Sequence, residues 1–402
     1  MSRMDELLRT HCPDGVIFKQ LGQVAGYSET RVDASTLDEE SFVGVDNLLS
    51  NQGGKVAASY KPNTARLTAY VKGDILLGNI RPYLKKVWLA TNDGGCSGDV
   101  LAIRISEEFK PQLDPGFLYR LLSSEGFFAF NMQHAKGAKM PRGSKTAILK
   151  YRVPVPPIAV QKEIVRILDT FSKLEAELEA ELEARRKQYT FYRDQLLTFT
   201  ERERRIRWAR MTEICLKTQT VRWSKVGDQE FAYIDLTSVD RQTHAIGETQ
   251  AIKASNAPSR AQQIVRTDDV LFGTTRPTLM RYCSIPERYD GQICSTGYCV
   301  LRPDREQVHP RWVFHLVSSS AFFRYVDENQ KGAGYPAIAD SAVMNWEVPV
   351  PPIDEQERIV GILDKFEALV NDLSSGLPAE IKGRRQQYEH YRDRLLTFQE
   401  AR

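Results

Sequence analysis

The chain has 402 residues, of which 42% are hydrophobic and 27% are charged, and its formal net charge is +3. This composition is typical of a globular protein with two or three domains, and it excludes disordered, fibrous and membrane-embedded classes. The sequence has neither a bilayer-spanning apolar run nor a signal-peptide core, and its cysteines lack zinc-site spacing, so we expect a reduced, cytoplasmic protein without a membrane partner.

The sequence repeats itself over a long distance. "VPVPPIAVQKEIVRILD" starts at Val153 and "VPVPPIDEQERIVGILD" starts at Val348, which is 348 − 153 = 195 residues later. The same offset relates "DILLGNIRP" at Asp74 to "DVLFGTTRP" at Asp269, and "KGAKMP" to "KGAGYP". The chain therefore consists of two copies of one unit, each long enough for a domain plus an appendage.

Each copy begins with a part of mixed helix and strand character. Short runs rich in β-branched residues and separated by turn residues predict strands. These runs lie at residues 73–80, 85–90, 99–105, 268–273 and 297–302. Apolar residues at helical spacing after a proline predict one helical stretch over residues 115–132 and another over residues 310–326. We therefore expect an α+β fold with two pseudo-symmetric mixed α/β domains, at residues 1–152 and 205–347.

The end of each copy predicts a long helix, within residues 153–204 and 348–402. Apolar residues recur at steps of three and four, as in a coiled-coil seam, and about 40 such residues give a helix of roughly 60 Å. The predicted seam residues, which we expect to contact the other helix or a partner, are Ile164, Leu168, Phe171, Leu178, Tyr189, Tyr192 and Leu196, then Ile359, Leu363, Phe366, Tyr388, Tyr391 and Leu395. Because each seam has to bury its apolar side chains, we expect the two seams of this chain to pack on each other.

Local signals mark the ends of these helices. The prolines of each "VPVPP" segment predict that an extended strand ends and that a helix follows. Asp354 and Glu357 match a capping box at the start of the second helix. Pro378 is expected to kink or break that helix.

The motifs of common enzymes are missing. The sequence has no Asn-Pro-Pro-aromatic motif and no glycine-rich adenosylmethionine loop. "GSKT" at residues 143–146 resembles the end of a P-loop but lacks the required glycine spacing. His309 and His315 are expected to be solvated or core residues rather than ligands. We therefore expect no catalytic residue, no metal and no cofactor in this chain.

A group of cations is the best local signal for binding. Its members are Lys136, Lys139, Arg142 and Lys145. Because glycine and proline separate them, a loop of this kind can approach phosphates closely, and a solvated turn is the alternative. In the second copy Lys331 matches Lys136, whereas Tyr335 stands at the place of Met140. A constant lysine with variable neighbours fits a backbone contact surrounded by sequence-reading positions.

Two arginines before prolines are further candidates. Arg81 and Arg276 occupy equivalent places in "NIRP" and "TTRP". Arginine can donate two hydrogen bonds to guanine or clamp a phosphate, and a structural ion pair with a strand carboxylate is the alternative. The neighbouring cations Lys85, Lys86 and Arg281 are weaker candidates for DNA contacts.

Charge is distributed unevenly between the copies. Residues 53–158 contain 16 Lys and Arg against 7 Asp and Glu, which gives 16 − 7 = +9, whereas residues 248–353 contain 11 of each. The basic part suggests a polyanionic partner. The segment "ERERRIRWAR" at residues 201–210 could touch DNA or a partner, but we interpret it as a charged linker.

Taken together, these segments resemble the specificity subunit of type I restriction–modification systems. The resemblance rests on the duplicated "VPVPPI" segments, on "RRKQYTFYRDQLLTF" from Arg185 and "RRQQYEHYRDRLLTF" from Arg384, and on "CPDGVIFKQLG" near the start. It covers essentially the whole chain. It implies two target-recognition domains, one for each half of a bipartite asymmetric DNA target, held apart by an antiparallel pair of conserved spacer helices.

The resemblance also implies partners and cofactors. It predicts that the chain binds double-stranded DNA and docks two modification subunits, which hold S-adenosylmethionine and methylate adenine. One or two restriction subunits, which use ATP and magnesium, can join the complex. In this family four-residue repeats such as "LEAELEAELEAR" from Leu174 set the gap between half-sites, and four helical residues add roughly 6 Å.

Two other functions are alternatives for such a sequence. A scaffold that does not read DNA, or an orphan or antirestriction relative of the same family, would keep the helices, but the retained Arg81/Arg276 and Lys136/Lys331 pairs argue against it. A catalytic function lacks the motif acids and the cofactor loop that it needs.

Overall fold

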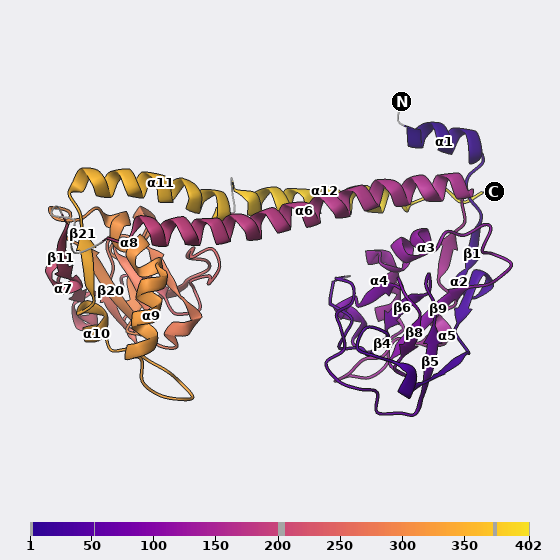
Figure 1. Ribbon diagram of the computed structural model, residues 1–402, viewed down its shortest axis with the longest axis horizontal. Helices are drawn as coiled ribbons and strands as arrows, with labels where there is room; N and C mark the ends of the chain where they lie inside the picture. The colour runs from indigo at the N-terminus through magenta and orange to yellow at the C-terminus, as the bar shows by residue number, and fades with distance from the viewer. Residues whose placement is uncertain (1–2, 52, 200–205, 373–375, 402) are drawn as a thin grey trace. The chain divides into compact units, whose positions relative to one another are not determined.

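The computed structural model describes residues 3–51, 53–199, 206–372 and 376–401. The chain divides into two compact units: unit 1 comprises residues 1–175 and 384–402, and unit 2 comprises residues 176–383. Each unit contains one globular domain and parts of the predicted helical segments (Figure 1). Among the described helices, none combines the length and the apolar character needed to cross a bilayer.

Unit 1 contains two four-stranded sheets. Their strands are β2 (Ala25–Tyr27), β3 (Arg31–Asp33), β4 (Phe42–Val43), β5 (Arg66–Tyr70), β6 (Ile75–Gly78), β7 (Val87–Leu89), β8 (Gly94–Cys96) and β9 (Val100–Ile105). The first sheet has the order β2-β9-β6-β7 and its pairs are antiparallel. The second has the order β3-β5-β8-β4, in which β4 pairs with β8 in parallel.

Unit 2 repeats this arrangement. Its strands are β12 (Cys215–Leu216), β13 (Gln219–Thr220), β14 (Phe231–Ile234), β15 (Gln250–Ile252), β16 (Ala261–Ile264), β17 (Val270–Gly273), β18 (Tyr282–Ser284), β19 (Ile293–Ser295) and β20 (Tyr298–Pro303). The sheet orders are β12-β20-β17-β18 and β13-β16-β19-β14-β15, so unit 2 differs by the added edge strand β15. The equal strand orders confirm the predicted repeat and the α+β class.

The predicted helical stretch in each domain is two helices rather than one. They are α3 (Pro115–Leu122) and α4 (Glu125–Gln133) in unit 1, and α8 (Pro310–Ser318) and α9 (Ser320–Asn329) in unit 2. A serine interrupts each stretch: the Ser124 hydroxyl accepts a hydrogen bond from the Phe127 N–H, and the Ser319 hydroxyl accepts one from the Phe322 N–H, both at 3.2 Å. Serine in a helix interior competes with the backbone in this way and starts a new helix as its N-cap.

Shorter elements complete the two domains. The helices are α1 (Arg3–His11), α2 (Leu21–Val24), α5 (Lys145–Ile148), α7 (Met211–Ile214) and α10 (Asp340–Met344). The 3-10 turns are η1 (Ala34–Thr36), η2 (Pro82–Leu84), η3 (Trp223–Lys225), η4 (Pro277–Leu279) and η5 (Glu287–Tyr289). The "GSKT" segment supplies the Ser144 N-cap of the four-residue helix α5 and is therefore not a phosphate-binding loop.

The "VPVPP" segments have the predicted geometry. β10 (Arg152–Pro154) pairs with β1 (Phe18–Gln20), and β21 (Glu347–Val350) pairs with β11 (Arg207–Arg210), both antiparallel. Each segment therefore ends a strand and leads into a helix. The charged-linker interpretation of residues 201–210 is wrong for residues 207–210, which form β11, and residues 201–205 lie outside the described part of the chain.

Three helices follow these strands. α6 (Ile158–Leu196) is a continuous helix of 39 residues, whereas the second copy forms α11 (Ile353–Asn371) and α12 (Leu377–Leu395). Pro378 lies in the first turn of α12, so the predicted break is confirmed. The capping box is wrong: the N-cap of α11 is Pro352, and Asp354 already lies inside the helix without a side-chain cap. Copy two can start this helix without a box because proline fixes the backbone at the start.

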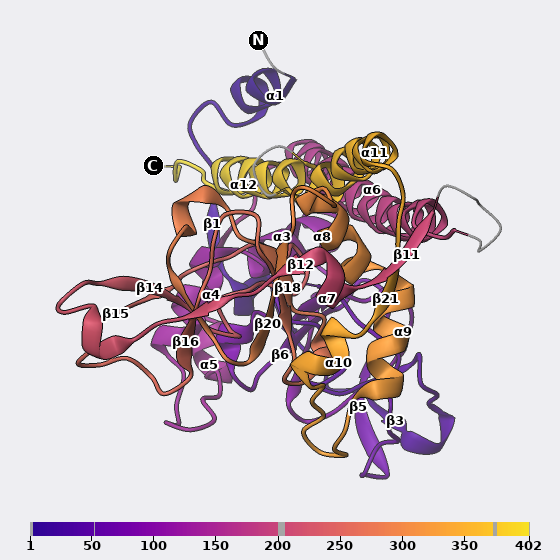
Figure 2. The ribbon, with the colours of Figure 1, turned by 90° about the vertical axis from the view of Figure 1, so that its left-hand side faces the viewer.

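Helices α3 and α8 each lie between a sheet and the long helices (Figures 1 and 2). In unit 1 the buried side chains of Phe117 and Leu121 pack against Ile75 of β6 and against Ile164 and Leu168 of α6. In unit 2 the core joins Trp312 and Leu316 of α8 to strands β17 and β20 and to Ile359 and Leu363 of α11. Each such buried side chain contributes about 1.5–3 kcal/mol to stability. The predicted seam residues Ile164 and Leu168 of α6, and Ile359 and Leu363 of α11, therefore attach each helix to its own domain.

Other seam residues join one long helix to another within a unit. In unit 1 the ring of Phe171 stacks on that of Tyr391 at 5.4 Å, and Glu175 pairs with Arg385 at 2.5 Å. These contacts run in opposite directions along α6 and α12, so the two helices are antiparallel. In unit 2 the ring of Tyr192 lies 5.9 Å from that of Phe366.

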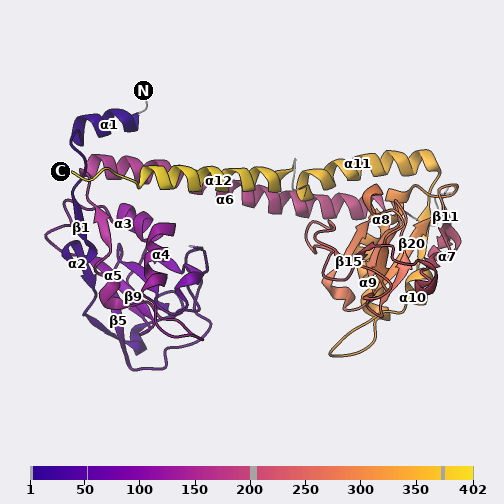
Figure 3. The ribbon, with the colours of Figure 1, turned by 180° about the vertical axis from the view of Figure 1, so that it is seen from behind.

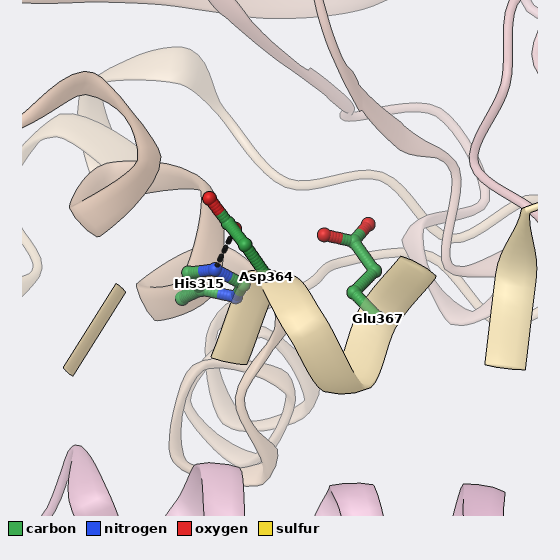
Figure 4. Close-up of side chains that lie close together, drawn as sticks. All are labelled: His315, Asp364 and Glu367. Atoms are coloured by element: carbon green, nitrogen blue, oxygen red, sulfur yellow. Dashed lines mark hydrogen bonds and ion pairs between the residues drawn. The ribbon is translucent and has the colours of Figure 1, made fainter. Parts of the chain in front are cut away.

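A polar joint connects each domain to both helical segments. In unit 1 the Arg120 guanidinium of α3 donates to the Asp169 carboxylate of α6 at 2.5 Å and to the Tyr388 hydroxyl of α12 at 2.9 Å. In unit 2 the equivalent residues, 195 positions on, are His315 and Asp364, whose Nε2 and Oδ1 atoms are 2.7 Å apart (Figure 4). The Tyr189 hydroxyl of α6 lies 3.4 Å from His315 Nδ1 and completes the second joint.

The unit 2 joint keeps its histidine neutral. His315 is fully buried, and this burial lowers the pKa of its imidazole to about 4, although the hydrogen bond to Asp364 opposes the shift. Arg311 supplies the positive charge instead: its guanidinium donates to Asp364 at 2.8 Å and also pairs with Glu367. Burial opposes ionisation of Asp364, but the hydrogen bonds from His315 and Arg311 lower the pKa of this carboxyl to about 2.

We predict that acid destabilises unit 2 through His315. An unfolded histidine has a pKa near 6.5. As the pH falls from about 6.5 towards 4, the unfolded state therefore binds a proton at His315 that the folded state does not bind. The stability is complete above pH 6.5, and linkage predicts a loss of about 2 kcal/mol between pH 7 and pH 5. Urea unfolding of the wild type and of His315→Gln at both pH values measures this loss.

His244 serves as the internal reference for this experiment. Burial also lowers the pKa of His244 to about 4. The His315→Gln variant should therefore keep the pH dependence of stability that comes from His244 and lose the part that comes from His315. An equal pH dependence in the wild type and in His315→Gln would contradict the assignment.

The last described residues pair with the first domain. The Val16 N–H donates to the Gln399 carbonyl at 2.8 Å, and the Ala401 N–H donates to the Val16 carbonyl at 3.0 Å. The Arg152 guanidinium pairs with the Glu400 carboxylate, and Figure 3 shows this end of the chain beside β1. Gly15 permits the approach, because its φ is +100° and a Cβ there would lie 2.8 Å from the Ala401 nitrogen.

We predict that Gly15→Ala displaces residues 399–401 from their backbone contact with Val16. The methyl group meets backbone atoms that cannot move aside cheaply, and the left-handed backbone adds strain of about 1–3 kcal/mol. Hydrogen exchange should become faster at the Val16 and Ala401 amides. Gly54→Ala is the matched control, because Gly54 also has positive φ, +85°, but open space around the added carbon. Equal protection of both amides in the wild type and in Gly15→Ala would refute this role.

Candidate nucleic-acid interface

Both units present an arginine in a left-handed backbone conformation at the end of a buried strand. Arg81 follows β6 with φ 50° and ψ 64°, and Arg276 follows β17 with φ 50° and ψ 58°. Four residues later, Lys85 and Met280 are also left-handed. We call residues 79–85 and 274–280 the arginine turns. Each left-handed residue other than glycine costs of the order of 1–3 kcal/mol, so the surrounding structure must fix these turns.

A second loop holds each arginine turn in place. Residues 136–142 and 331–337 form short hairpins, closed by backbone bridges between Lys136 and Arg142 and between Lys331 and Ala337. We call them the lysine hairpins. The Arg81 N–H donates to the Pro141 carbonyl in one unit, and the Arg276 N–H donates to the Pro336 carbonyl in the other, both at 2.7 Å.

Glycine is required in both hairpins. Gly137 and Gly332 have φ of +102° and +100°, in the region that side chains rarely adopt. The lysine before each glycine is exposed. This common backbone is the feature that the "KGAKMP" and "KGAGYP" repeats encode.

Among the described residues, the alternative interpretation of the turn arginines, a structural ion pair with a strand carboxylate, is not found. Asp74 and Asp269 are both buried, but their partners are Arg104 of β9 and Arg302 of β20, each at 2.7 Å. In the described part of the chain, neither the Arg81 nor the Arg276 guanidinium has an ion-pair partner, and both side chains are exposed. Of the two alternatives for these arginines, the structure therefore removes the structural one.

The cations predicted in unit 1 divide into two groups. Lys136, Lys139, Arg142 and Lys145 are exposed on and beside the lysine hairpin. Arg142 is 3.3 Å from Asp99, in an exposed pair. The other two are engaged within the domain: Lys85 pairs with Glu125 at 2.5 Å, and Lys86 donates to the Val45 carbonyl at 2.8 Å.

Unit 2 carries different side chains on the same backbone. Lys331 is exposed, and Tyr335 at the tip of the hairpin is 74% exposed. The Arg276 guanidinium lies over the Tyr335 ring, 4.3 Å from its centroid. Arg281, the counterpart of Lys86, is half-buried, and its Nε atom has no hydrogen-bond partner among the described residues.

The hollow beside Arg81 contains residues that the sequence did not single out. Tyr60, Asn63, Asp99 and Met140 line it together with Arg81. Tyr60 and Asn63 belong to a long irregular loop between β4 and β5. No periodic pattern marks such a loop, so only the tertiary structure brings these side chains to the arginine turn.

The remaining seam residues differ in their exposure to solvent. Tyr189 is buried in the core of unit 2, with Leu196 partly buried beside it, while Tyr388 and Leu395 pack against the core of unit 1. Leu178 is half-buried on α6. Tyr192 and Tyr391 are each 39% exposed, and Phe191, next to Tyr192, is a large apolar side chain that is 63% exposed.

One group of side chains has donor atoms at metal-binding spacing. The ligand atoms of His315, Asp364 and Glu367 lie within 4.8 Å of one another. The Arg311 guanidinium already pairs with both carboxylates, and His315 donates to one of them. The positive charge that a metal would supply is thus provided by the chain, and we interpret the group as the joint of unit 2.

Comparison with known proteins identifies relatives. The family described as "Type I restriction modification DNA specificity domain" matches residues 19–184 and 238–383. The EcoR124I/EcoR124II specificity subunit of Escherichia coli is 32% identical over 61% of this chain and 63% of its own length, so less than two thirds of that relative is matched. A putative type I restriction enzyme specificity subunit of Haemophilus influenzae is 28% identical over 72% of this chain and 74% of its own.

Solved structures agree in fold. A chain from a study of complex assembly in a type I restriction–modification system has a TM-score of 0.65 at 19% identity, covering 96% of this chain and 98% of that one. The S subunit of a type I system from M. genitalium has a TM-score of 0.52 at 14% identity, covering 94% and 96%. With the family matched in both of its copies, this chain belongs to the type I restriction–modification DNA specificity family.

Proposed function

We propose that this chain is the DNA-specificity subunit of a type I restriction–modification complex, in which each unit recognises one half of a bipartite, asymmetric DNA target. One observation carries the proposal. The arginine turn and the lysine hairpin recur in both units with the same backbone hydrogen bonds, while the side chains on them differ. Two related domains that read two different half-sites need this combination of constant backbone and variable side chains.

The constant parts suit contacts with the DNA backbone. A lysine before a left-handed glycine sits on an exposed hairpin, where a phosphate can approach both the ammonium group and the peptide chain. The basic character of residues 53–158 adds sequence-independent attraction in unit 1. Unit 2 is neutral over residues 248–353, so its affinity should depend more on direct contacts with bases.

The variable parts suit contacts with bases. At equivalent positions the hairpin of unit 1 carries Lys139, Met140 and Arg142, and that of unit 2 carries Gly334, Tyr335 and Ala337. Side chains of different size and hydrogen-bonding capacity favour different base edges in the major groove. An asymmetric target follows from this difference.

We propose that the long helices dock two modification subunits, which supply S-adenosylmethionine and the adenine-methylating chemistry. The chain itself then contributes no catalytic residue and no cofactor. Exposed aromatic side chains in each unit, Phe191 and Tyr192 of unit 2 and Tyr391 of unit 1, support docking, because aromatic residues are enriched where proteins associate. Restriction subunits with ATP and magnesium, one or two per complex, and a cytoplasmic location complete the proposal.

Co-expression with the modification subunit, followed by sequencing of methylated adenines, tests this function. We expect one bipartite motif, and we expect DNA binding in gel shifts to weaken steeply with salt. Replacing residues 16–150 by those of a relative should change one half of the motif and leave the other half intact. An assembled complex that binds no DNA would favour the scaffold alternative, and methylation by the isolated chain would favour an enzyme.

We also predict that deletion of Leu178–Glu181, one "LEAE" repeat of α6, changes the gap between the half-sites. Four helical residues correspond to roughly 6 Å, or one to two base pairs. The same sequencing experiment should find both half-sequences unchanged. As a control, replacement of these four residues by alanine keeps the helix length and should keep the gap. An active deletion variant with an unchanged gap would rule out this role for the repeat.

A further inference from the structure

The hairpin of unit 2 places an arginine over a tyrosine ring at a solvent-exposed position. The Arg276 guanidinium is 4.3 Å from the centroid of Tyr335, and the tyrosine is 74% exposed. The pair lies where the arginine turn and the lysine hairpin meet, since Arg276 also donates its N–H to the Pro336 carbonyl.

The arrangement restricts the guanidinium from two directions. The backbone of Arg276 is left-handed, and the hydrogen bond to Pro336 fixes it, so the side chain leaves the main chain in one direction. The contact with the Tyr335 ring restricts the guanidinium further. Among the described residues the guanidinium has no ion-pair partner, so its N–H groups stay available to donate hydrogen bonds.

Guanine presents two acceptors, N7 and O6, on its major-groove edge, and two parallel N–H groups of arginine match them. A phosphate can also accept two such hydrogen bonds, and restricting the side chain lowers the cost of ordering it for either contact. The ring beside Arg276 is present in unit 2 and replaced by Met140 in unit 1. A difference between the two units suits a base contact, because the bases differ between half-sites whereas the phosphate backbone does not.

We propose that Arg276, positioned by Tyr335, reads a guanine in the half-site of unit 2. This inference rests on the proposed function, because it names the base that one of the two units recognises. Arg276 is the specificity-determining residue, and Tyr335 is a positioning residue that acts through it.

Unit 1 differs at this point. Met140 stands at the place of Tyr335, and among the described residues Arg81 makes no cation–π contact like that of Arg276. Arg142, which is alanine in unit 2, pairs with Asp99, and this pair offers a carboxylate beside the cations. The guanine reader is thus specific to unit 2, and unit 1 must recognise its half-site with a different set of groups.

The lysine variant separates the two chemistries of Arg276. Arg276→Lys keeps the charge for a phosphate but loses the paired N–H groups. In the complex with the modification subunit, we expect this variant to accept other bases at one guanine position of the unit 2 half-site, with at least a tenfold loss of discrimination. Methylated-adenine sequencing and competition gel shifts with a single base changed provide the measurement.

Variants of Tyr335 test the positioning role. Tyr335→Phe keeps the ring and should keep the motif, whereas Tyr335→Met, which carries the unit 1 residue, should relax the same single position as Arg276→Lys. Arg288→Lys is the matched control, because Arg288 also lies over a tyrosine ring, that of Tyr289, on another element of unit 2. It should leave the motif unchanged.

The outcomes separate the inference from the function on which it depends. A wild-type complex without a bipartite motif would refute the proposed function. A normal motif that Arg276→Lys does not alter, together with a uniform loss of affinity in Arg276→Ala, would overturn the guanine assignment and make Arg276 a phosphate contact. Relaxation in the half-site of unit 1 instead would also overturn it. The unfolding temperature of each variant, compared with the wild type, shows that the fold is retained.

Discussion

The attachment of each domain to its helices is the contact on which the rest of the arrangement depends. In both units an aspartate of the "ILD" segment meets a basic or imidazole group from the helix over the sheet, and a tyrosine from another long helix completes the joint. Three segments far apart in sequence are thereby fixed to one another. A recognition loop can be aimed only if its domain has one orientation on its helix, and these joints, together with the apolar cores beneath them, fix that orientation.

The two joints solve the same electrostatic problem differently. Arg120 carries its own charge to Asp169, whereas burial keeps His315 neutral and Arg311 neutralises Asp364 and Glu367. Removing one partner from a buried charged group is costly, so substitutions at a joint must be compensated by a neighbour. Position 116, the counterpart of Arg311, is glycine in unit 1. Unit 1 has Gly116 and Arg120, whereas unit 2 has Arg311 and His315 at the equivalent positions. Each joint thus has one arginine, placed at a different position.

Much of this fold follows from the sequence, but the parts that carry specificity do not. The 195-residue offset predicted the repeat. The prolines predicted the change from strand to helix in each "VPVPP" segment and the break near Pro378, because these features depend on the local sequence. The Ser124 hydroxyl caps α4 and separates it from α3. The spacing of the apolar residues continues through this serine, so it could not predict the break. The partner of Asp74 and the stacking of Arg276 on Tyr335 depend on contacts 30 and 59 residues apart (104 − 74 and 335 − 276). Composition and spacing cannot predict which cation meets which partner.

The geometry of the long helices agrees with the proposal that the distance between half-sites changes in steps of four residues. Residues of α6 face two ways, towards the core of a domain and towards another long helix, and both faces must survive a change of length. Four residues turn an α-helix by about 400°, which returns each face to within about 40° of its place, whereas two residues would turn it to the opposite side. The second copy has four more residues between its phenylalanine and its "RR" pair than the first, 384 − 366 = 18 against 185 − 171 = 14. These residues lie between Phe366 and Arg384, the stretch of the second copy in which α11 ends at Asn371 and α12 begins at Leu377, whereas the corresponding stretch of the first copy belongs to the continuous helix α6.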